Sequence, residues 1–162
     1  MQVIGSPFEA DAQCSHLVRL GIADAAATTD SDLYVFGCPL TLYQHLSNSS
    51  KLGSMVRTRK TCCETINSMT AIEVVWMTCL CGCDYINNLQ GCGIDKAISI
   101  VKEWRSKSQQ DRQTMLTEME STGKWPKSAN QELFPTGSTG APGFVARFNL
   151  AVAAFMAHRV SM

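Results

Sequence analysis

The segment AAATTDSDLYVF, residues 25–36, constrains the fold of this 162-residue chain more than any other stretch of its sequence. Small, β-prone residues lead into Asp30 and Asp32, and an apolar run over residues 33–36 follows the two carboxylates. A strand that ends in such a pair and leads into a helical turn is typical of an α/β protein, whose functional sites lie at the carboxyl ends of strands. Two carboxylates this close repel each other unless a positive group lies between them. The segment therefore predicts an α/β fold and raises the question of which positive group accompanies the pair.

The residues before this segment predict a strand, a helix and a second strand. Val3 and Ile4 are expected to end a buried strand, and the helix is expected to run to about Leu20. The second strand is expected over residues 22–29. The residues that define the helix are Ser6 as N-cap, Pro7 at the first position, Glu9 as the capping-box partner of Ser6, Cys14, Leu17 and Val18 on the inward face, and Gly21 at the end.

The rest of the chain predicts helices separated by polar segments. Residues 45–60 are small, polar and basic and are expected to form a mobile loop. A capping box at Thr70 and Glu73 predicts an apolar helix through Leu80, and another helix ends near Arg105. The remaining expectations are a polar helix over 106–120, a linker over 121–143, and a last amphipathic helix over 144–160 with Phe148, Val152, Phe155 and Met156 on one face.

The composition fits one ordinary globular domain, with 45% hydrophobic and 17% charged residues. The sequence lacks the apolar run of about 18 residues that a membrane span needs, and its start lacks the features of a signal peptide. The eight cysteines are therefore expected to be reduced thiols in the cytosol or nucleus. Cys79, Cys81 and Cys83 alternate, which leaves a zinc site open, but the spacing is not C-x₂-C and structural thiols fit it better.

The charges are distributed unevenly although the net charge is zero. Residues 1–32 carry five acids and one base, whereas residues 33–63 carry no acid and four bases, which are Lys51, Arg57, Arg59 and Lys60. An acidic centre beside a basic segment suits a metal-dependent enzyme that acts on a polyanion. Two unrelated solvated faces would give the same distribution.

Five carboxylates stand out as candidate metal ligands, namely Glu9, Asp11, Asp30, Asp32 and Asp84. If they meet at one edge of the sheet, divalent cations would relieve their repulsion, and Mg²⁺ prefers such oxygen ligands. Two such ions can activate a water molecule and stabilise the leaving oxygen of a phosphodiester. Local roles remain open, because Glu9, Asp30 and Asp32 could serve helix starts and Asp84 could close an Asx turn.

Three motifs, taken in order and spacing, carry a family resemblance: PFEADAQC, TTDSDLYVFGCP and GCDYINNLQGCGIDKAISIV. Together they resemble the flap endonuclease and exonuclease 1 family of structure-specific 5′ nucleases over residues 3 to about 104, and more weakly in FNLAVAAFMAHRV near the end. Asp11 and the GCDY motif look closer to exonuclease 1 than to flap endonucleases.

The resemblance implies a fold and a division of the chain. The expected fold class is α/β, a partial parallel-sheet nuclease core of the PIN-like type followed by an all-α helix–two-turn–helix region. Residues 1–80 would be the internal part of the core, residues 81–105 the helix–two-turn–helix (a helix-hairpin-helix type of DNA-binding element), residues 106–143 a polar linker and residues 144–162 a C-terminal helix of the core. The N-terminal part of the family's core, with two more aspartates and a basic helix, has no counterpart in this sequence, which makes catalysis by this chain alone doubtful.

The resemblance also implies an activity. Asp30, Asp32 and Asp84 would hold one Mg²⁺ ion, Asp11 would lie between two ions, and Glu9 would contribute on the other side, with Mn²⁺ as a substitute. Gly91, Gly93 and Lys96 would hold a duplex phosphate beside a K⁺ ion, although Asp95 weakens that contact, and Arg57, Arg59 and Lys60 could touch the DNA backbone.

The implied function is 5′–3′ exonuclease or 5′-flap endonuclease action on nicked, gapped or flapped DNA in the nucleus. It would serve DNA repair and recombination, mismatch repair included, beside repair proteins and without a membrane. The alternatives are a catalytically inactive DNA-binding fragment and, with less support, an α/β fragment whose acids serve only as caps.

Overall fold

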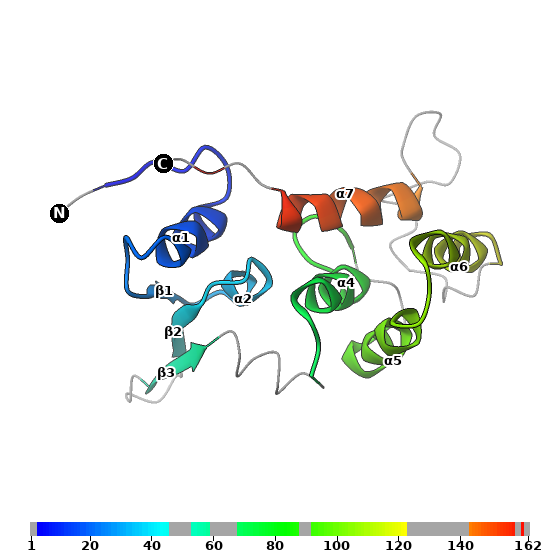
Figure 1. The fold of residues 1–162 in the computed structure, drawn as a ribbon, viewed down its shortest axis with the longest axis horizontal. Helices are drawn as coiled ribbons and strands as arrows, with labels where there is room; N and C mark the ends of the chain where they lie inside the picture. Colours follow the sequence, from blue (N-terminus) through cyan, green and yellow to red (C-terminus); the bar gives the residue numbers. More distant parts are fainter. Residues whose placement is uncertain are drawn as a thin grey trace. The chain divides into compact units, whose positions relative to one another are not determined.

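The computed structural model of the chain describes residues 3–45, 53–58, 68–87, 92–122, 143–157 and 160. The chain divides into two compact units, one made of Met1–Val74 with Phe155–Met162 and the other of Val75–Ala154. Figure 1 shows the helices and strands in chain order. The described strands belong to the first unit, and the described elements of the second unit are helices. The predicted α/β core followed by a helical region is therefore confirmed.

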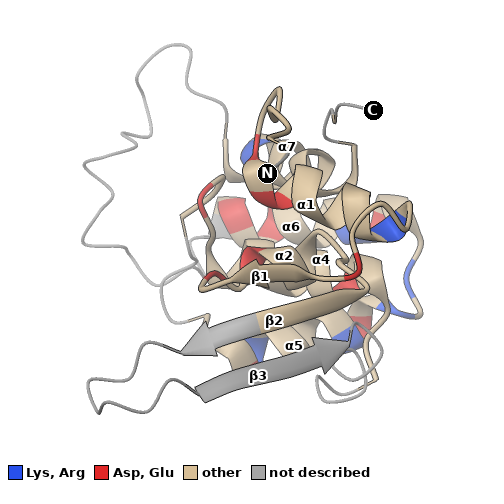
Figure 2. Ribbon diagram, turned by 90° about the vertical axis from the view of Figure 1, so that its left-hand side faces the viewer, with Lys and Arg blue, Asp and Glu red and all other residues tan. Residues whose placement is uncertain are grey.

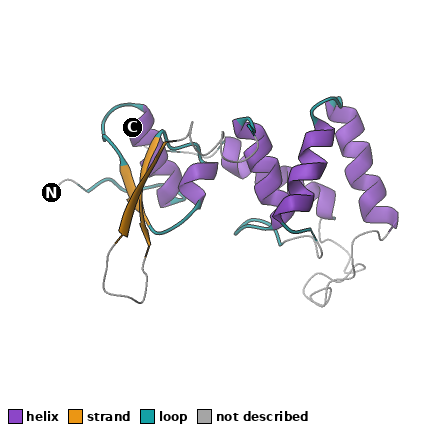
Figure 3. Cartoon of the chain, turned by 90° about the horizontal axis from the view of Figure 1, so that it is seen from below, coloured by secondary structure: helices purple, strands orange, loops and turns teal. Residues whose placement is uncertain are grey.

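A small sheet with the strand order β1-β2-β3 organises the first unit (Figure 3). β1 (Ala26–Thr28) pairs in parallel with β2 (Leu40–His45), and β2 pairs antiparallel with β3 (Gly53–Thr58). The parallel pair needs a crossover connection, and α2 (Asp32–Val35), a single helical turn, lies within it. Because β3 runs antiparallel, the described sheet is mixed rather than wholly parallel.

Two predictions about strands are wrong. The mobile loop expected over residues 45–60 is in part β3, which pairs along its whole length with β2; pairing and packing override a weak local propensity. Val3 and Ile4 do not end a buried strand, since their side chains are 80% and 40% exposed and no described strand pairs with them. The strand expected over residues 22–29 is shorter and begins at Ala26, because a turn fills the space after the preceding helix.

Helix α1 (Ala10–Arg19) ends at Gly21, as predicted. Gly21 has a φ of 70°, the left-handed conformation that glycine adopts without a steric penalty. The Gly21 N–H donates to the carbonyl of Val18 (3.1 Å), and the Ile22 N–H donates to the carbonyl of Leu17 (3.0 Å). These two bonds form a Schellman motif, which satisfies the last carbonyls of α1 and turns the chain toward β1.

The start of α1 differs from the predicted capping box. Glu9 is the N-cap residue, and its side chain makes no capping hydrogen bond. The Ser6 hydroxyl donates to the Glu9 carbonyl (2.8 Å) and accepts the N–H of Phe8 (3.4 Å), so it closes a turn before the helix instead of capping it. The Glu9 carboxylate is consequently not used in helix capping.

The core of the first unit forms where α1 packs on β1 and α2. Val18, Ala26, Leu33 and Cys38 are its buried members. The inward face of α1 also contains Ala12, Gln13 and Ser15. Cys14, expected on this face, is exposed, and the small residues Ala12 and Ser15 are buried there instead.

Four longer helices complete the described residues: α4 (Ala71–Cys81), α5 (Ile94–Trp104), α6 (Gln109–Thr122) and α7 (Phe144–Met156). One half of the predicted capping box of α4 is confirmed, since the Glu73 carboxylate accepts the N–H of Thr70 (2.7 Å). The predicted polar helix is α6, and Ser108 and Asp111 cap its start reciprocally. In the part of the chain that the structure covers, every helix is too short or too polar to cross a membrane.

Aromatic rings form the centre of the second unit. Trp104 is 1% exposed and contacts Trp76 and Phe148 edge to face, with ring centroids 5.9 Å apart in both pairs. Leu80, Val101 and Leu116 are fully buried in the same unit. The last helix follows its predicted face only in part, because Met156 is 55% exposed. The predicted linker over residues 121–143 lies almost wholly outside the described residues.

Candidate functional site

Asp11 connects the two pairs of acidic residues in the first unit. It lies in the first turn of α1 and is partly buried. Burial raises the pKa of the Asp11 carboxyl, and the negative charges of Asp30 and Glu9 raise the pKa further, in that order. Figure 2 shows acidic ribbon segments at the start of α1 and beside β1 and α2. The structure therefore brings three predicted site residues, Glu9, Asp11 and Asp30, within electrostatic reach of one another.

The pair Asp30 and Asp32 lies where β1 ends and α2 begins, as predicted. The Asp30 N–H donates to the Thr28 hydroxyl (2.9 Å), and the Asp32 N–H donates to Oδ1 of Asp30 (3.1 Å). Asp30 thus also closes a local turn, whereas the helix-start role that the sequence had left open for it falls to Ser31, the N-cap residue of α2. A carboxylate has two oxygens with about four acceptor sites, so one backbone bond does not exhaust Asp30.

One backbone carbonyl fixes α1 against α2. The Phe36 carbonyl accepts hydrogen bonds from the Ser15 hydroxyl (3.0 Å) and from Nη1 of Arg19 (2.8 Å). Ser15 is fully buried. Since α1 carries Asp11 and α2 follows Asp30 and Asp32, these two bonds set the spacing between the acidic pairs. Sequence reasoning missed this contact, and its only signal was a pair of polar residues four apart on a helix.

The donor chemistry of these acids suits a hard divalent cation. Carboxylate oxygens are the ligands that Mg²⁺ prefers, and a cation would offset the repulsion that raises the pKa of Asp11. These acids nevertheless do not form a complete metal site. Within the described residues, no group of three or more His, Cys, Asp or Glu side chains is placed to hold a metal ion. The acids fit magnesium by chemistry, and their present geometry provides only part of a site.

Asp84 belongs to the second unit. It is exposed in a turn that two backbone hydrogen bonds close, from the Cys83 N–H to the Ile86 carbonyl (2.8 Å) and from the Ile86 N–H to the Cys83 carbonyl (3.1 Å). The backbone, rather than an Asx turn of Asp84, closes this bend. Its role as a metal ligand stays a prediction.

The expected phosphate site is described only at the start of α5. Gly93 is the N-cap residue of α5, in an extended conformation, and a Cβ atom there would meet nothing within 4 Å. Lys96 and Asp95 are exposed in the first turn, whereas Gly91 lies outside the described residues. Gly93 therefore leaves open space in front of a helix N-terminus, which suits the close approach of an anion.

The basic segment is described at one position only. Arg57 lies in β3 with its backbone opposite Thr41 of β2. Lys51, Arg59 and Lys60 lie outside the described residues. Their predicted contacts with DNA stay predictions.

The described cysteines are free thiols. The hydrogen bond to Cys83, followed by burial, raises the pKa of the Cys79 thiol far above its usual range, and burial raises the pKa of Cys81 and Cys92. High thiol pKa values favour the protonated form and indicate packing rather than reactivity or metal binding.

A comparison with protein families shows which family this chain belongs to. The XPG I-region model matches residues 1–84, more than half of the chain, and the match includes all five candidate carboxylates. The chain belongs to the XPG I-region family. This family membership confirms the resemblance that the three motifs indicate.

Curated relatives of this family member include two kinds of nuclease. Flap endonuclease 1 of Naegleria gruberi is 33% identical over 104 residues, which cover 63% of this chain and 26% of the relative. Exonuclease 1 of Danio rerio is 34% identical over 97 residues, which cover 60% of this chain and 12% of the relative. The chain thus spans about a quarter or less of these two proteins. Such similar identities do not decide between the two branches, so the closer likeness to exonuclease 1 stays a prediction.

Solved structures show the same fold at low sequence identity. The catalytic core of Rad2 in complex with DNA substrate has a TM-score of 0.65 and 18% identity, covering 98% of this chain and 50% of that one. The Holliday junction-resolving enzyme GEN1 in complex with product DNA and Mg²⁺ has a TM-score of 0.62 and 22% identity, covering 97% of this chain and 39% of that one. The XPG I-region member therefore has the fold of part of these nuclease cores.

Proposed function

We propose that this chain is part of a metal-dependent nuclease that hydrolyses DNA phosphodiesters at nicks, gaps or 5′ flaps, as a 5′–3′ exonuclease or a flap endonuclease. The observation that carries the proposal is the match of residues 1–84 to the XPG I-region family, which includes all five candidate carboxylates. The raised pKa of Asp11 beside Asp30 and Glu9 supports it, because perturbed carboxyls cluster at functional sites.

The family supports a nuclease rather than another phosphate-handling enzyme. The relatives are named flap endonuclease 1 and exonuclease 1, and the structural neighbours were solved with DNA and with Mg²⁺. Because this chain spans only a minor part of each relative, the activity of the whole enzyme is part of the proposal.

Two ions are proposed to be held by the five acids. Asp30, Asp32 and Asp84 would hold one Mg²⁺ or Mn²⁺, and Asp11 and Glu9 would contribute to holding the other. When bound, such ions activate a water molecule and stabilise the leaving oxygen of the phosphodiester.

Other residues of the chain position these carboxylate ligands and influence their protonation. Ser15 and Arg19 hold α1 through the Phe36 carbonyl. A bound cation would favour the charged form of Asp11, which burial and the neighbouring charges disfavour.

The DNA contacts are proposed for the backbone and the basic residues. The start of α5 around Gly91, Gly93 and Lys96 holds a phosphate of the uncut duplex, with K⁺ on nearby carbonyls in a helix-hairpin-helix type of element. Arg57, Arg59 and Lys60 supply flexible cations for the backbone. The place of action is the nucleus, in DNA repair and recombination, mismatch repair included.

Cleavage of labelled DNA tests the proposal. The full chain is incubated with an end-labelled nicked duplex and a 5′-flap duplex in Mg²⁺ or Mn²⁺, with EDTA as control. We expect EDTA-sensitive cleavage, which the Asp30→Ala/Asp32→Ala variant loses and an Asp24→Ala control keeps, because Asp24 is exposed and lies outside the acidic pairs. Cleavage that survives in the double variant would contradict the assigned ligands.

A second candidate function is DNA binding without catalysis. It is favoured by the absence, within the described residues, of three metal-ligating side chains around one point. It predicts no cleavage in Mg²⁺ or Mn²⁺, together with DNA binding that weakens steeply with salt. Binding that Lys96→Ala weakens, without any cleavage, would select this function over the first.

A further inference from the structure

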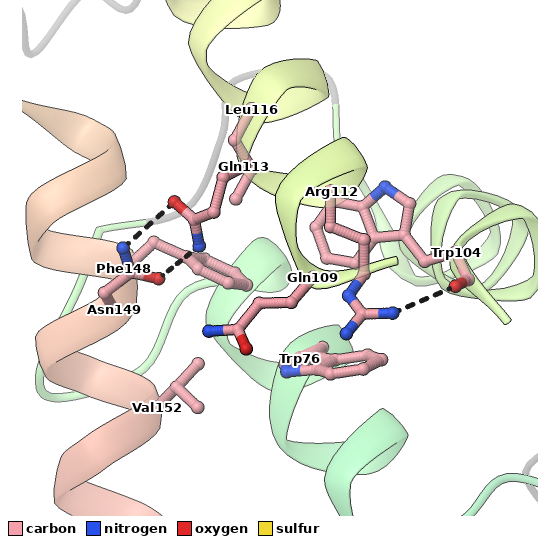
Figure 4. A pocket seen from close by; sticks show the side chains of 9 residues that line it. All are labelled: Trp76, Trp104, Gln109, Arg112, Gln113, Leu116, Phe148, Asn149 and Val152. Atoms are coloured by element: carbon pink, nitrogen blue, oxygen red, sulfur yellow. Dashed lines mark hydrogen bonds between the residues drawn. The ribbon is translucent and has the colours of Figure 1, made fainter. Parts of the chain in front are cut away.

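The second unit contains a cavity of about 230 Å³ that the proposed nuclease mechanism does not use (Figure 4). Residues from α4, α5, α6 and α7 line it, and its apolar lining residues are Trp76, Trp104, Phe148, Leu116 and Val152. Drug-sized ligands occupy pockets of roughly 300–1,000 Å³, so this cavity suits a smaller guest with a single ring system.

Polar groups at the cavity are amides rather than carboxylates. Nε2 of Gln113 donates to Oδ1 of Asn149 (2.8 Å), and Nδ2 of Asn149 donates to Oε1 of Gln113 (3.1 Å). The exposed Gln109 side chain extends between Val152 and Trp76 in Figure 4, and no hydrogen bond holds its amide within the described residues. These groups offer both donors and acceptors to the edge of a planar guest.

Arg112 adds a fixed positive charge to the cavity wall. Its guanidinium lies over the ring of Trp76, 4.7 Å from the centroid, and it donates to the backbone carbonyls of Trp104 and Lys107. The lining residues include no acid. A cationic guest is therefore disfavoured, and a neutral, π-rich guest with acceptor atoms is favoured.

Trp104 contributes wall surface to the cavity rather than a hydrogen bond to a guest. Its side chain lines the cavity and is 1% exposed. Its indole N–H is buried without a partner in the described part of the chain, and in Figure 4 it points away from Gln109 and Val152.

We propose that this cavity binds a single nucleobase. Aromatic and guanidinium faces stack on bases, and amide side chains bond to their edges, which is how proteins hold unpaired bases. The base could belong to an unpaired nucleotide of DNA or to a free nucleotide, and the first source rests on the proposed function. The cavity would then fix one base of an unpaired strand.

Side-chain NMR of the full chain tests the base itself. Deoxyadenosine is titrated while the indole N–H resonance of Trp104 and the amide resonances of Gln113 and Asn149 are followed, with deoxyribose 5-phosphate as the probe that lacks a base. One ring system binds weakly, so we expect saturation with a Kd of about 1 mM for deoxyadenosine and none for the sugar phosphate. Unchanged resonances with deoxyadenosine would overturn the proposal.

A matched pair of variants locates the site. Val152→Phe fills the cavity and is expected to weaken deoxyadenosine binding at least about tenfold, because it removes the space for the ring. Val145→Phe makes the same change in the same helix at a partly buried residue that does not line the cavity, and it should leave binding unchanged. Equal loss in both folded variants would contradict a base in this cavity.

A second titration distinguishes a base that belongs to DNA from a base of a free nucleotide. Single-stranded DNA with one 2-aminopurine is titrated with the chain, and a fluorescence change that Val152→Phe removes would support a base from DNA. Deoxyadenosine binding without this change would overturn the DNA source and assign the cavity to free nucleotides. Neither titration needs cleavage or a divalent cation, so a chain that fails the nuclease test can still pass this one.

Discussion

At the scale of single residues, Asp11 has the clearest perturbation among the candidate acids. It is partly buried next to two other acids, and both burial and like charges raise its pKa. A carboxyl that served only as a helix-start residue would gain from full exposure near the positive end of the helix. The position of Asp11 thus lowers the stability of the metal-free fold and provides the density of negative charge that a cation requires.

Replacing Asp11 by Asn should stabilise the metal-free chain at neutral pH. The folded state binds the Asp11 proton more tightly than the unfolded chain, so this residue costs stability as the pH rises from 3.8 through the raised folded pKa. We expect a gain within about 1 kcal/mol at pH 7 that disappears below the unfolded pKa. Urea unfolding at several pH values measures it, with Asp24→Asn as the exposed control; a loss of stability at pH 7 would contradict the account.

At the scale of elements, the Phe36 carbonyl is the point where α1 and α2 are joined. Two donors, the Ser15 hydroxyl and the Arg19 guanidinium, converge on this one acceptor. Either donor alone can still satisfy the carbonyl. Removing both donors takes away both of these hydrogen bonds at once, which costs more than the sum of two separate losses.

A double-mutant cycle measures this coupling. Ser15→Ala and Arg19→Ala should each cost about 1 kcal/mol in the free energy of unfolding, and the double variant should cost more than their sum. Ser99→Ala is the control, since its hydroxyl bonds only to the Asp95 carbonyl on an exposed helix face. Additive losses in urea unfolding would mean that the two donors act independently.

Two glycines that precede helices, Gly143 and Gly93, allow a second test of the contacts between elements. A Cβ at Gly143 would lie 2.6 Å from Oε1 of Glu120, the atom that accepts the N–H of Phe144, whereas a Cβ at Gly93 would meet nothing within 4 Å. Both residues precede the first residue of a helix, so the loss of glycine at the cap is shared. The Glu120 carboxylate must then move away from the Phe144 N–H, so Gly143→Ala should destabilise the chain more than Gly93→Ala in thermal unfolding, by about 1 kcal/mol for the lost hydrogen bond. Equal melting temperatures would contradict the Glu120 contact.

Local signals explain which elements could be predicted from the sequence. The capping box of Thr70 and Glu73, Gly21 at the end of α1, and the acids between β1 and α2 depend on neighbours within a few residues. β3 could not be predicted, because its stability comes from pairing with β2 rather than from its own polar sequence. The Ser15 and Arg19 contacts with Phe36 span 21 and 17 residues, a range that no local pattern reports.

The candidate site, like the fold, could be predicted only where local sequence signals determine it. Spacing placed Glu9 and Asp11 at a helix start and Asp30 at a strand end, but their electrostatic contact depends on how α1 packs on β1 and α2. Ser6 was misread because its hydroxyl bonds to the Glu9 carbonyl instead of capping the helix. That difference removes the local explanation for the Glu9 carboxylate.

At the scale of the whole molecule, this member of the XPG I-region family corresponds to part of a nuclease core. The chain is matched over 98% of its length by the Rad2 core but covers 50% of that chain. The predicted domain limits, the missing part of the core as a partner, and the DNA contacts of the basic segment stay predictions. The five acids nevertheless lie within the family match, so their role can be tested in this chain directly.

A pH titration of the Asp11 carboxyl carbon by NMR, with and without Mg²⁺, tests whether these acids bind a divalent cation together. If the acids of α1 and β1 share a cation site, Mg²⁺ will lower the apparent pKa of Asp11 in the native chain, because a bound cation favours the carboxylate. The Asp30→Ala/Asp32→Ala variant, which removes both acids at the end of β1, will lose most of this response. A pKa of Asp11 that Mg²⁺ leaves unchanged in the native chain would contradict a shared metal site at these residues.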